Sequence, residues 1–299
     1  MKRKADQVDP VLMFCVGATK AGTSWLHDQL RNHPDCRLRT IKEYHYFNLK
    51  EPHHWENRLG EIQAEIDELA ALPPAEQSDY RQERLADLRA WQPVIAARKI
   101  DVARYCDFHM AHLGTGQVMG DLTPAYALMP GKDLSVLASA ARDVRVIYLI
   151  RDPLARLWSH LRMVAGRNAP DTFDAAAQDL LASTLAGQTE GGIQGILRRG
   201  DYRSILPKLR RVFDPSKLLV MFTEDLMTPS GFARLLDFLG LRPMQAQLDK
   251  PVHEGRALAF PDPQRRATLQ FLRAQYDFIA SEFPALPDVW RRNLSEATL

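Results

Sequence analysis

The sequence has few cysteines and no long hydrophobic run. Its three cysteines are odd in number and form no CxxC pair, so we expect no structural zinc site. Cys15 lies within an apolar run and is expected to be a buried thiol. The apolar stretch before Gly17 is only about eight residues long, too short for a signal peptide or a membrane span. These absences favour a cytoplasmic protein.

Charge of one sign is also lacking. The chain has 39 basic and 37 acidic residues, a net charge of +2 with histidine neutral, so no large nucleic-acid-binding patch is expected. There is no internal repeat and no low-complexity stretch. Apolar residues make up 45% of the 299 residues, enough for a sizeable core. We expect a single domain over residues 1–299, while the oligomeric state stays open.

Residues 11–26 carry the most informative pattern. A strand-like apolar run ends at Gly17, a short loop holds Lys20 and Gly22, and two hydroxyl residues then begin an amphipathic helix. In this order the loop N–H groups and the positive end of the helix dipole point at one place. The segment therefore predicts an anion site, with Lys20 adding a full charge.

A second segment predicts another anion contact. Residues 144–150 form an apolar, β-branched run that is typical of a buried strand. Arg151 follows at the strand tip, and Pro153 fits the first position of a helix. Ser159 lies eight residues after Arg151 and so about two turns into that helix. An arginine so placed can hold a phosphate through two parallel N–H bonds.

Together these motifs resemble the sulfotransferases that use 3′-phosphoadenosine-5′-phosphosulfate (PAPS). Two patterns are typical of that family: K-x-G-T-S-W after a first strand and R-D-P-x-x-R-x-x-S after a later strand. The resemblance implies that the first loop holds the 5′-phosphosulfate, through Lys20, Ala21, Gly22, Thr23, Ser24 and Trp25. It implies that Arg151 and Ser159 hold the 3′-phosphate.

The segment Lys42-Glu-Tyr-His-Tyr-Phe-Asn48 resembles the K-E-x-H-F-F-D segment of glycosaminoglycan sulfotransferases of the heparan sulfate type. The resemblance implies that Glu43 is the catalytic base, with Lys42 and His45 assisting, although His45 itself is not excluded as the principal base. Asn48 stands where an acidic residue is usual. An amide cannot accept a proton, so contacts to the acceptor differ at this position.

Three further segments resemble the same family. Asp121, Thr123 and Tyr126 match a G-E-K-[ST]-P-x-Y segment on the acceptor side, with Leu122 at the place of a common lysine. Tyr202, in a G-x-Y pattern, is expected to contact the nucleotide or to pack. Arg256 is expected in a late loop that closes over the 3′-phosphate.

The order of the elements predicts an α/β fold. The resemblance implies a P-loop-like sulfotransferase fold with a central, mainly parallel sheet, flanking helices and the ligand at the carboxyl ends of the strands. Residues 54–98 are charged and helical in pattern, with a break at residues 72–75, which predicts a helical hairpin inserted in the fold. The hairpin is either a solvated cap or a lid or acceptor-binding insertion.

The function implied by the resemblance is transfer of a sulfuryl group from PAPS to a hydroxyl group, less readily to an amine. The product is 3′,5′-adenosine bisphosphate, and no metal is required. A saccharide or other small-molecule acceptor is expected. Two alternatives stay open: an ATP-dependent kinase with Asp152 as the metal-holding acid, and a nucleotide-binding protein without catalysis. Lys20 does not directly precede the hydroxyl residues, as a kinase P-loop requires.

Overall fold

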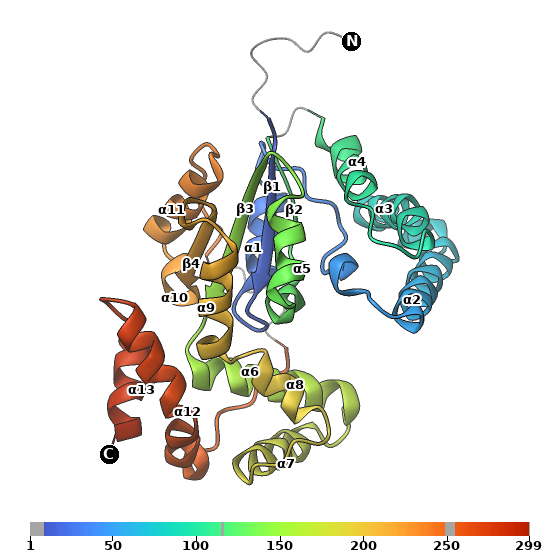
Figure 1. Ribbon diagram of the computed structural model, residues 1–299. Helices are drawn as coiled ribbons and strands as arrows, with labels where there is room; N and C mark the ends of the chain where they lie inside the picture. Colours follow the sequence, from blue (N-terminus) through green and yellow to red (C-terminus); the bar gives the residue numbers. More distant parts are fainter. Residues whose placement is uncertain (1–8, 115–116, 249–254, 299) are drawn as a thin grey trace.

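A four-stranded parallel sheet forms the centre of the computed structural model, which describes residues 9–114, 117–248 and 255–298 (Figure 1). The strands are β1 (Val11–Gly17), β2 (Val118–Asp121), β3 (Asp143–Ile150) and β4 (Leu218–Phe222), in the spatial order β2-β1-β3-β4. Every residue of β1 is buried, as expected for a central parallel strand covered on both faces. The predicted parallel sheet is confirmed.

The register of the strands brings their carboxyl ends to one edge. Val11 pairs with Val118 of β2 and Asp143 of β3, and Ile150 pairs with Phe222 of β4. The residues that follow β1, β3 and β4 therefore meet at this edge, where open α/β sheets bind their ligands.

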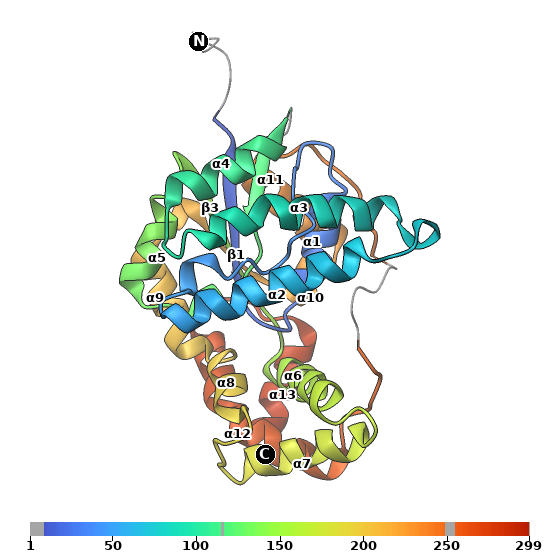
Figure 2. The ribbon, with the colours of Figure 1, turned by 90° about the vertical axis from the view of Figure 1, so that its right-hand side faces the viewer.

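Helices cover both faces of the sheet, and a further group lies beyond its carboxyl edge (Figures 1 and 2). One face carries α5 (Gly131–Ala138) and α9 (Tyr202–Val212), and the other carries α1 (Thr23–Arg31), α10 (Thr223–Leu226) and α11 (Pro229–Leu239). The group beyond the edge consists of α6 (Pro153–Asn168), α7 (Phe173–Leu185), α8 (Ile193–Arg198), α12 (Asp262–Glu282) and α13 (Asp288–Thr298). Within the described ranges, no helix is both long and apolar enough to cross a bilayer.

The predicted helical hairpin lies beyond the β2 edge of the sheet. It consists of α2 (Pro52–Ala70) and α3 (Asp79–Ala96), joined through a short 3-10 turn at Pro74–Glu76, and it is followed by α4 (Val102–Leu113) (Figure 2). A cluster of buried rings joins these helices to the segment before α2, and its members are Tyr44, Tyr46, Phe47, Trp91, Tyr105 and Phe108. Helices α4 and α13 were not predicted from the sequence.

Candidate active site

The loop between β1 and α1 has the backbone of an anion cradle. Lys20 and Gly22 both have positive φ values, 68° and 85°, and Gly22 is the N-cap of α1. At Gly22 this conformation favours glycine, and a Cβ there would lie 3.1 Å from the Thr223 methyl group. The first N–H groups of α1 have no partner within the helix, so they are available to an anion in front of the loop.

The tips of β3 and β4 hold this loop in place. The Arg151 guanidinium donates a hydrogen bond to the Lys20 carbonyl at 3.1 Å. The Thr223 hydroxyl, at the end of β4, donates to the Ala21 carbonyl at 2.8 Å. Tyr202 of α9 is fully buried, and its hydroxyl donates to the Arg151 carbonyl at 2.7 Å while accepting from the Arg151 N–H at 3.1 Å. Tyr202 thus positions the strand tip that carries Arg151.

Positive charge gathers around Lys20. Burial lowers the pKa of Lys20, and the nearby cations Arg151, Arg162, Lys42 and Arg167 lower it further. Such a grouping of like charges destabilises itself unless an anion lies among them. The cluster therefore fits a ligand that carries several negative charges.

Glu43 lies beside this cluster between two partners. Its carboxylate accepts from Lys42 Nζ at 3.0 Å and lies 3.5 Å from His45 Nε2. Burial alone would raise the pKa of Glu43, but the hydrogen bond from His45 and the charge of Lys42 outweigh it and lower the pKa to about 2. The carboxylate is therefore ionised at neutral pH, as a proton acceptor must be. The structure brings the side chains of Lys42, Glu43 and His45 together, and their catalytic roles stay a prediction.

Asp121 supports the loop that carries these residues. Its carboxylate is fully buried and accepts from the hydroxyls of Thr123 at 2.5 Å, Tyr126 at 2.9 Å and Tyr105 at 3.0 Å. Thr123 in turn accepts from the His45 N–H at 3.4 Å. Burial raises the pKa of Asp121 to about 6 despite these bonds. The burial of Asp121, Thr123 and Tyr126 favours a positioning role over direct contact with an acceptor.

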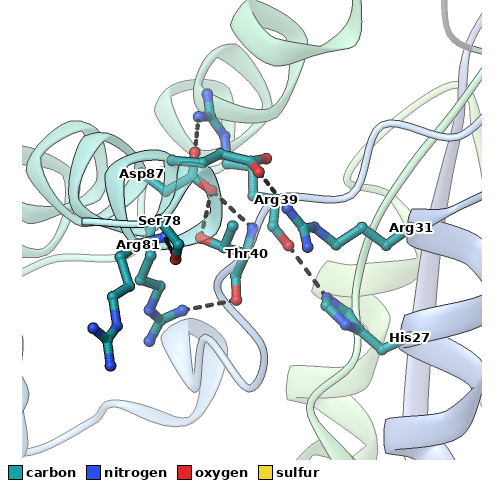
Figure 3. A network of polar contacts seen from close by, with 9 residues as sticks. His27, Arg31, Arg39, Thr40, Ser78, Arg81 and Asp87 are labelled. Atoms are coloured by element: carbon teal, nitrogen blue, oxygen red, sulfur yellow. Dashed lines mark hydrogen bonds and ion pairs between the residues drawn. The ribbon is translucent and has the colours of Figure 1, made fainter. Parts of the chain in front are cut away.

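A second buried carboxylate holds the same chain segment from the hairpin side (Figure 3). Asp87 of α3 accepts from the Arg39 guanidinium at 2.7 Å and from the N–H and hydroxyl of Thr40 at 2.8 and 2.7 Å. His27 of α1 lies 3.2 Å from the Arg39 carbonyl. This network fixes the hairpin to the chain three residues before Glu43.

Three other predicted residues have different surroundings. Trp25 is buried, donates to the Gln247 carbonyl and packs on α11, and Ser159 is buried on α6. Arg256 is exposed: its guanidinium lies over the Phe173 ring and beside the Asp174 carboxylate, at the start of α7. Its role toward the donor stays a prediction. His253, in the same predicted loop, lies outside the described residues.

Sequence reasoning missed several cations of the site. Arg162 follows Ser159 by three residues and thus shares a face of α6, a signal that helical spacing could have provided. Arg199 is half-buried, and Glu43 contributes to its electrostatic environment. The Arg58 guanidinium on α2 donates to the Glu43 carbonyl at 3.2 Å, a contact that no local pattern indicates.

Asp152 is committed to other contacts. Its carboxylate caps α6 through the Ala155 N–H at 2.9 Å and accepts from Tyr276 at 2.7 Å and from Asn293 at 2.9 Å. These bonds attach α12 and α13 to the start of α6, so this carboxylate is not directed at a nucleotide. Asp152 is therefore not available as the metal-holding acid that the kinase interpretation requires.

Comparisons with known proteins bear on the family and the fold of the chain. A model of the sulfotransferase family matches residues 10–245. A solved sulfotransferase from Alicyclobacillus acidocaldarius superposes with a TM-score of 0.61 at 17% identity, covering 95% of this chain and all of the other. This likeness shows a shared fold.

Two further solved structures are more distant. The sulfotransferase domain of the Synechococcus PCC 7002 olefin synthase is 18% identical, with a TM-score of 0.47, and the alignment covers 81% of this chain and 77% of that one. The sulfotransferase domain from the curacin biosynthetic pathway has the same identity and score and covers 97% of each chain. No curated protein matches the sequence.

Proposed function

Because the chain belongs to the sulfotransferase family, we propose that it transfers a sulfuryl group from PAPS to a hydroxyl group of a carbohydrate, a glycolipid or another small acceptor. An amine is the less favoured acceptor. One observation supports a polyanionic donor: the cations Arg151, Arg162, Lys42 and Arg167 surround Lys20, in the loop before α1, and a ligand of several negative charges would relieve their repulsion.

Each part of the site has a distinct task in this proposal. PAPS supplies the sulfuryl group, whose bond to the 5′-phosphate oxygen breaks as a bond to the acceptor oxygen forms. Lys20 and the N–H groups of the loop would stabilise the charge that grows on the leaving oxygen. Arg151 and Ser159 would hold the 3′-phosphate, with Arg162 beside them. The proton of the acceptor hydroxyl would pass to the Glu43 carboxylate or to His45.

The donor is tested first by thermal stabilisation. We expect 3′,5′-adenosine bisphosphate without magnesium to raise the unfolding midpoint more than AMP does, since a ligand at 100 times its Kd adds about 2.7 kcal/mol. The shift should disappear in Arg151→Ala and persist in Arg203→Ala, an exposed arginine on α9. A shift of the unfolding midpoint only with ATP and magnesium would refute the proposal and favour the kinase interpretation.

A further inference from the structure

One arginine of α6 is enclosed in the protein without a carboxylate to pair with. Arg156 is 2% exposed and lies where α6, α8 and the start of α9 meet, beyond the carboxyl edge of the sheet (Figure 1). Its guanidinium donates to the Ile196 carbonyl and lies beside Nδ1 of His160, both at 3.4 Å. Within the described ranges, no Asp or Glu forms an ion pair with it. Arg39, which is also buried, has the Asp87 carboxylate at 2.7 Å.

The charged groups around Arg156 do not compensate its charge. Burial lowers the pKa of the Arg156 guanidinium, and the cations Arg151 and Arg199 lower it further. Burial and the charge of Arg156 lower the pKa of His160 to about 3, so this ring is neutral at pH 7. The Asp201 carboxylate accepts instead from an amide of α12 at 2.9 Å. A buried cation without a counter-charge costs stability.

Gly200, just before α9, lies directly against this guanidinium. A Cβ at Gly200 would lie 2.1 Å from Nη2 and 2.3 Å from Cζ of Arg156. The φ of Gly200 is not positive, so the close approach of Arg156, and not the backbone conformation, requires glycine here. Two residues later, the Tyr202 hydroxyl pairs with the N–H and the carbonyl of Arg151. Arg156 therefore packs against the turn that positions the tip of β3.

The place of Arg156 on α6 also relates it to the donor side. Ser159 follows three residues later, so the two side chains are neighbours on the helix. The cations that act on His160 include Lys20 of the cradle as well as Arg156. Because Arg156 is enclosed, it would act on a ligand across the intervening protein and not by contact. A charge acts more strongly across such a medium than across water.

We propose that Arg156 is a positioning residue of the donor site, and that its unpaired charge destabilises the free protein and is compensated when a polyanion binds at the tips of β1 and β3. Because that polyanion is the proposed donor, PAPS, this role rests on the proposed function. Such a residue differs from one that only supports the fold, because its removal should change stability and affinity in opposite senses.

The first test is Arg156→Met, which removes the charge and keeps an unbranched side chain. We expect the unfolding midpoint of the ligand-free protein to stay the same or to rise by a few degrees, since an apolar replacement of an unpaired buried ion is neutral or stabilising. The Kd of 3′,5′-adenosine bisphosphate, measured by calorimetry, should rise about tenfold, the equivalent of one favourable charge interaction.

Arg145→Met on β3 is the matched control for this variant. Arg145 has a carboxylate partner, Asp143, at 2.9 Å, and it lies toward the end of the strand that is away from the candidate donor site. Arg145→Met should therefore lower the unfolding midpoint and leave the Kd of the bisphosphate unchanged.

The second test moves the charge without removing it. In Gly200→Ala the new Cβ must displace the Arg156 guanidinium, so we expect the Kd of the bisphosphate to rise several-fold. The three atoms nearest to that Cβ all belong to Arg156, so Gly200→Ala should have little further effect in an Arg156→Ala background. Gly60→Ala on α2, where a Cβ meets nothing within 4 Å, is the control.

The outcomes separate this role from the donor itself. If the bisphosphate binds the wild type and Arg156→Met with equal Kd, or if Gly200→Ala has the same effect with and without Arg156, the role of Arg156 is overturned and the donor stands. If the bisphosphate does not bind the wild type, the proposed donor is refuted, and the role of Arg156 is refuted with it.

Discussion

The candidate donor side and the candidate acceptor side of this site are built in different ways. The donor side is formed by the tips of β1, β3 and β4 and by the N-terminus of α1, and its supporting residues Tyr202 and Thr223 are buried. The candidate acceptor side is the hairpin of α2 and α3, where Asn57, Tyr80 and Arg81 are exposed. A polyanionic donor would be held by a rigid frame, whereas an acceptor at the hairpin would meet a solvent-facing surface that can change without disturbing the sheet.

The segment that carries Glu43 joins the two sides. Asp121, at the end of β2, supports it from the sheet through Thr123, and Asp87 on α3 holds it from the hairpin through Arg39 and Thr40. Both supports are buried carboxylates, and each can be removed separately. Substitutions at these places test whether the two sides act as one site.

The largest effect is expected at the junction itself. Glu43→Gln removes the candidate proton acceptor but keeps the shape of the side chain, so we expect sulfuryl transfer from PAPS to fall about 10²–10⁴-fold. Stabilisation by the bisphosphate should persist, because the donor contacts lie elsewhere. Glu68→Gln, an exposed site on α2, is the control.

The same experiment separates the two candidate bases. If Glu43→Gln retains near-normal turnover while His45→Gln does not, His45 is the base. A protein without catalysis would show no turnover in its unsubstituted form, which would leave nucleotide binding as the remaining interpretation.

The second effect concerns the attachment of the hairpin. Asp87→Ala leaves the buried Arg39 without its ion-pair partner, and breaking a buried pair in this way costs about 3–5 kcal/mol. The free energy of unfolding from urea denaturation measures the loss. Glu83→Ala, on the same helix α3, breaks a more exposed pair with Arg31 of α1 and should cost less than about 1 kcal/mol. Equal losses would mean that the Asp87 network does not anchor the hairpin.

The third effect is a pH dependence at Asp121. Burial raises the pKa of Asp121 to about 6 in the folded protein, above the ordinary value of 3.8 that applies to the unfolded chain. The folded state therefore binds this proton more tightly, and the resulting stability is present below about pH 4 and lost as the pH rises through 6. The difference between these two pKa values corresponds to about 3 kcal/mol in the free energy of unfolding. Asp121→Asn should remove this pH dependence between pH 4 and 6, and an unchanged profile in urea titrations would contradict the assignment.

Local sequence signals were sufficient for the sheet and for the cradle. The run from Val11 to Gly17 is an uninterrupted apolar segment bounded by a glycine, and the strand has these bounds. The hairpin helices were predicted within a few residues, because proline and charge patterns mark their ends. Such elements depend on their own residues more than on distant partners.

The parts that the sequence did not reveal depend on contacts between distant segments. Helix α4 owes its place to the packing of Tyr105 and Phe108 against residues of other elements. The burial of Tyr126 beneath the Glu43 segment follows from its bond to Asp121 and could not be read from a motif. Arg58 donates to the Glu43 carbonyl from 15 residues further along the chain, a contact that depends on how α2 lies against that segment.

The smallest expected effect tests how firmly the donor side is held. Tyr202→Phe leaves the N–H and carbonyl of Arg151 without the buried hydroxyl that pairs with both, at a cost of about 1–3 kcal/mol. Nearby Tyr148 is also fully buried, but its hydroxyl has no hydrogen-bond partner in the part of the chain that the structure describes. Tyr148→Phe should therefore be neutral or slightly stabilising, since it removes a buried hydroxyl and breaks no hydrogen bond.

Affinity for the bisphosphate separates positioning from stability in this pair. If Tyr202 orients Arg151, Tyr202→Phe should raise the Kd of 3′,5′-adenosine bisphosphate several-fold at a temperature where the variant is fully folded, while Tyr148→Phe should leave the Kd unchanged. If Tyr202→Phe lowers only the unfolding midpoint, the tyrosine supports the fold and not the donor contact. The donor side would then resemble the acceptor side, with Arg151 adjusting its position to the ligand.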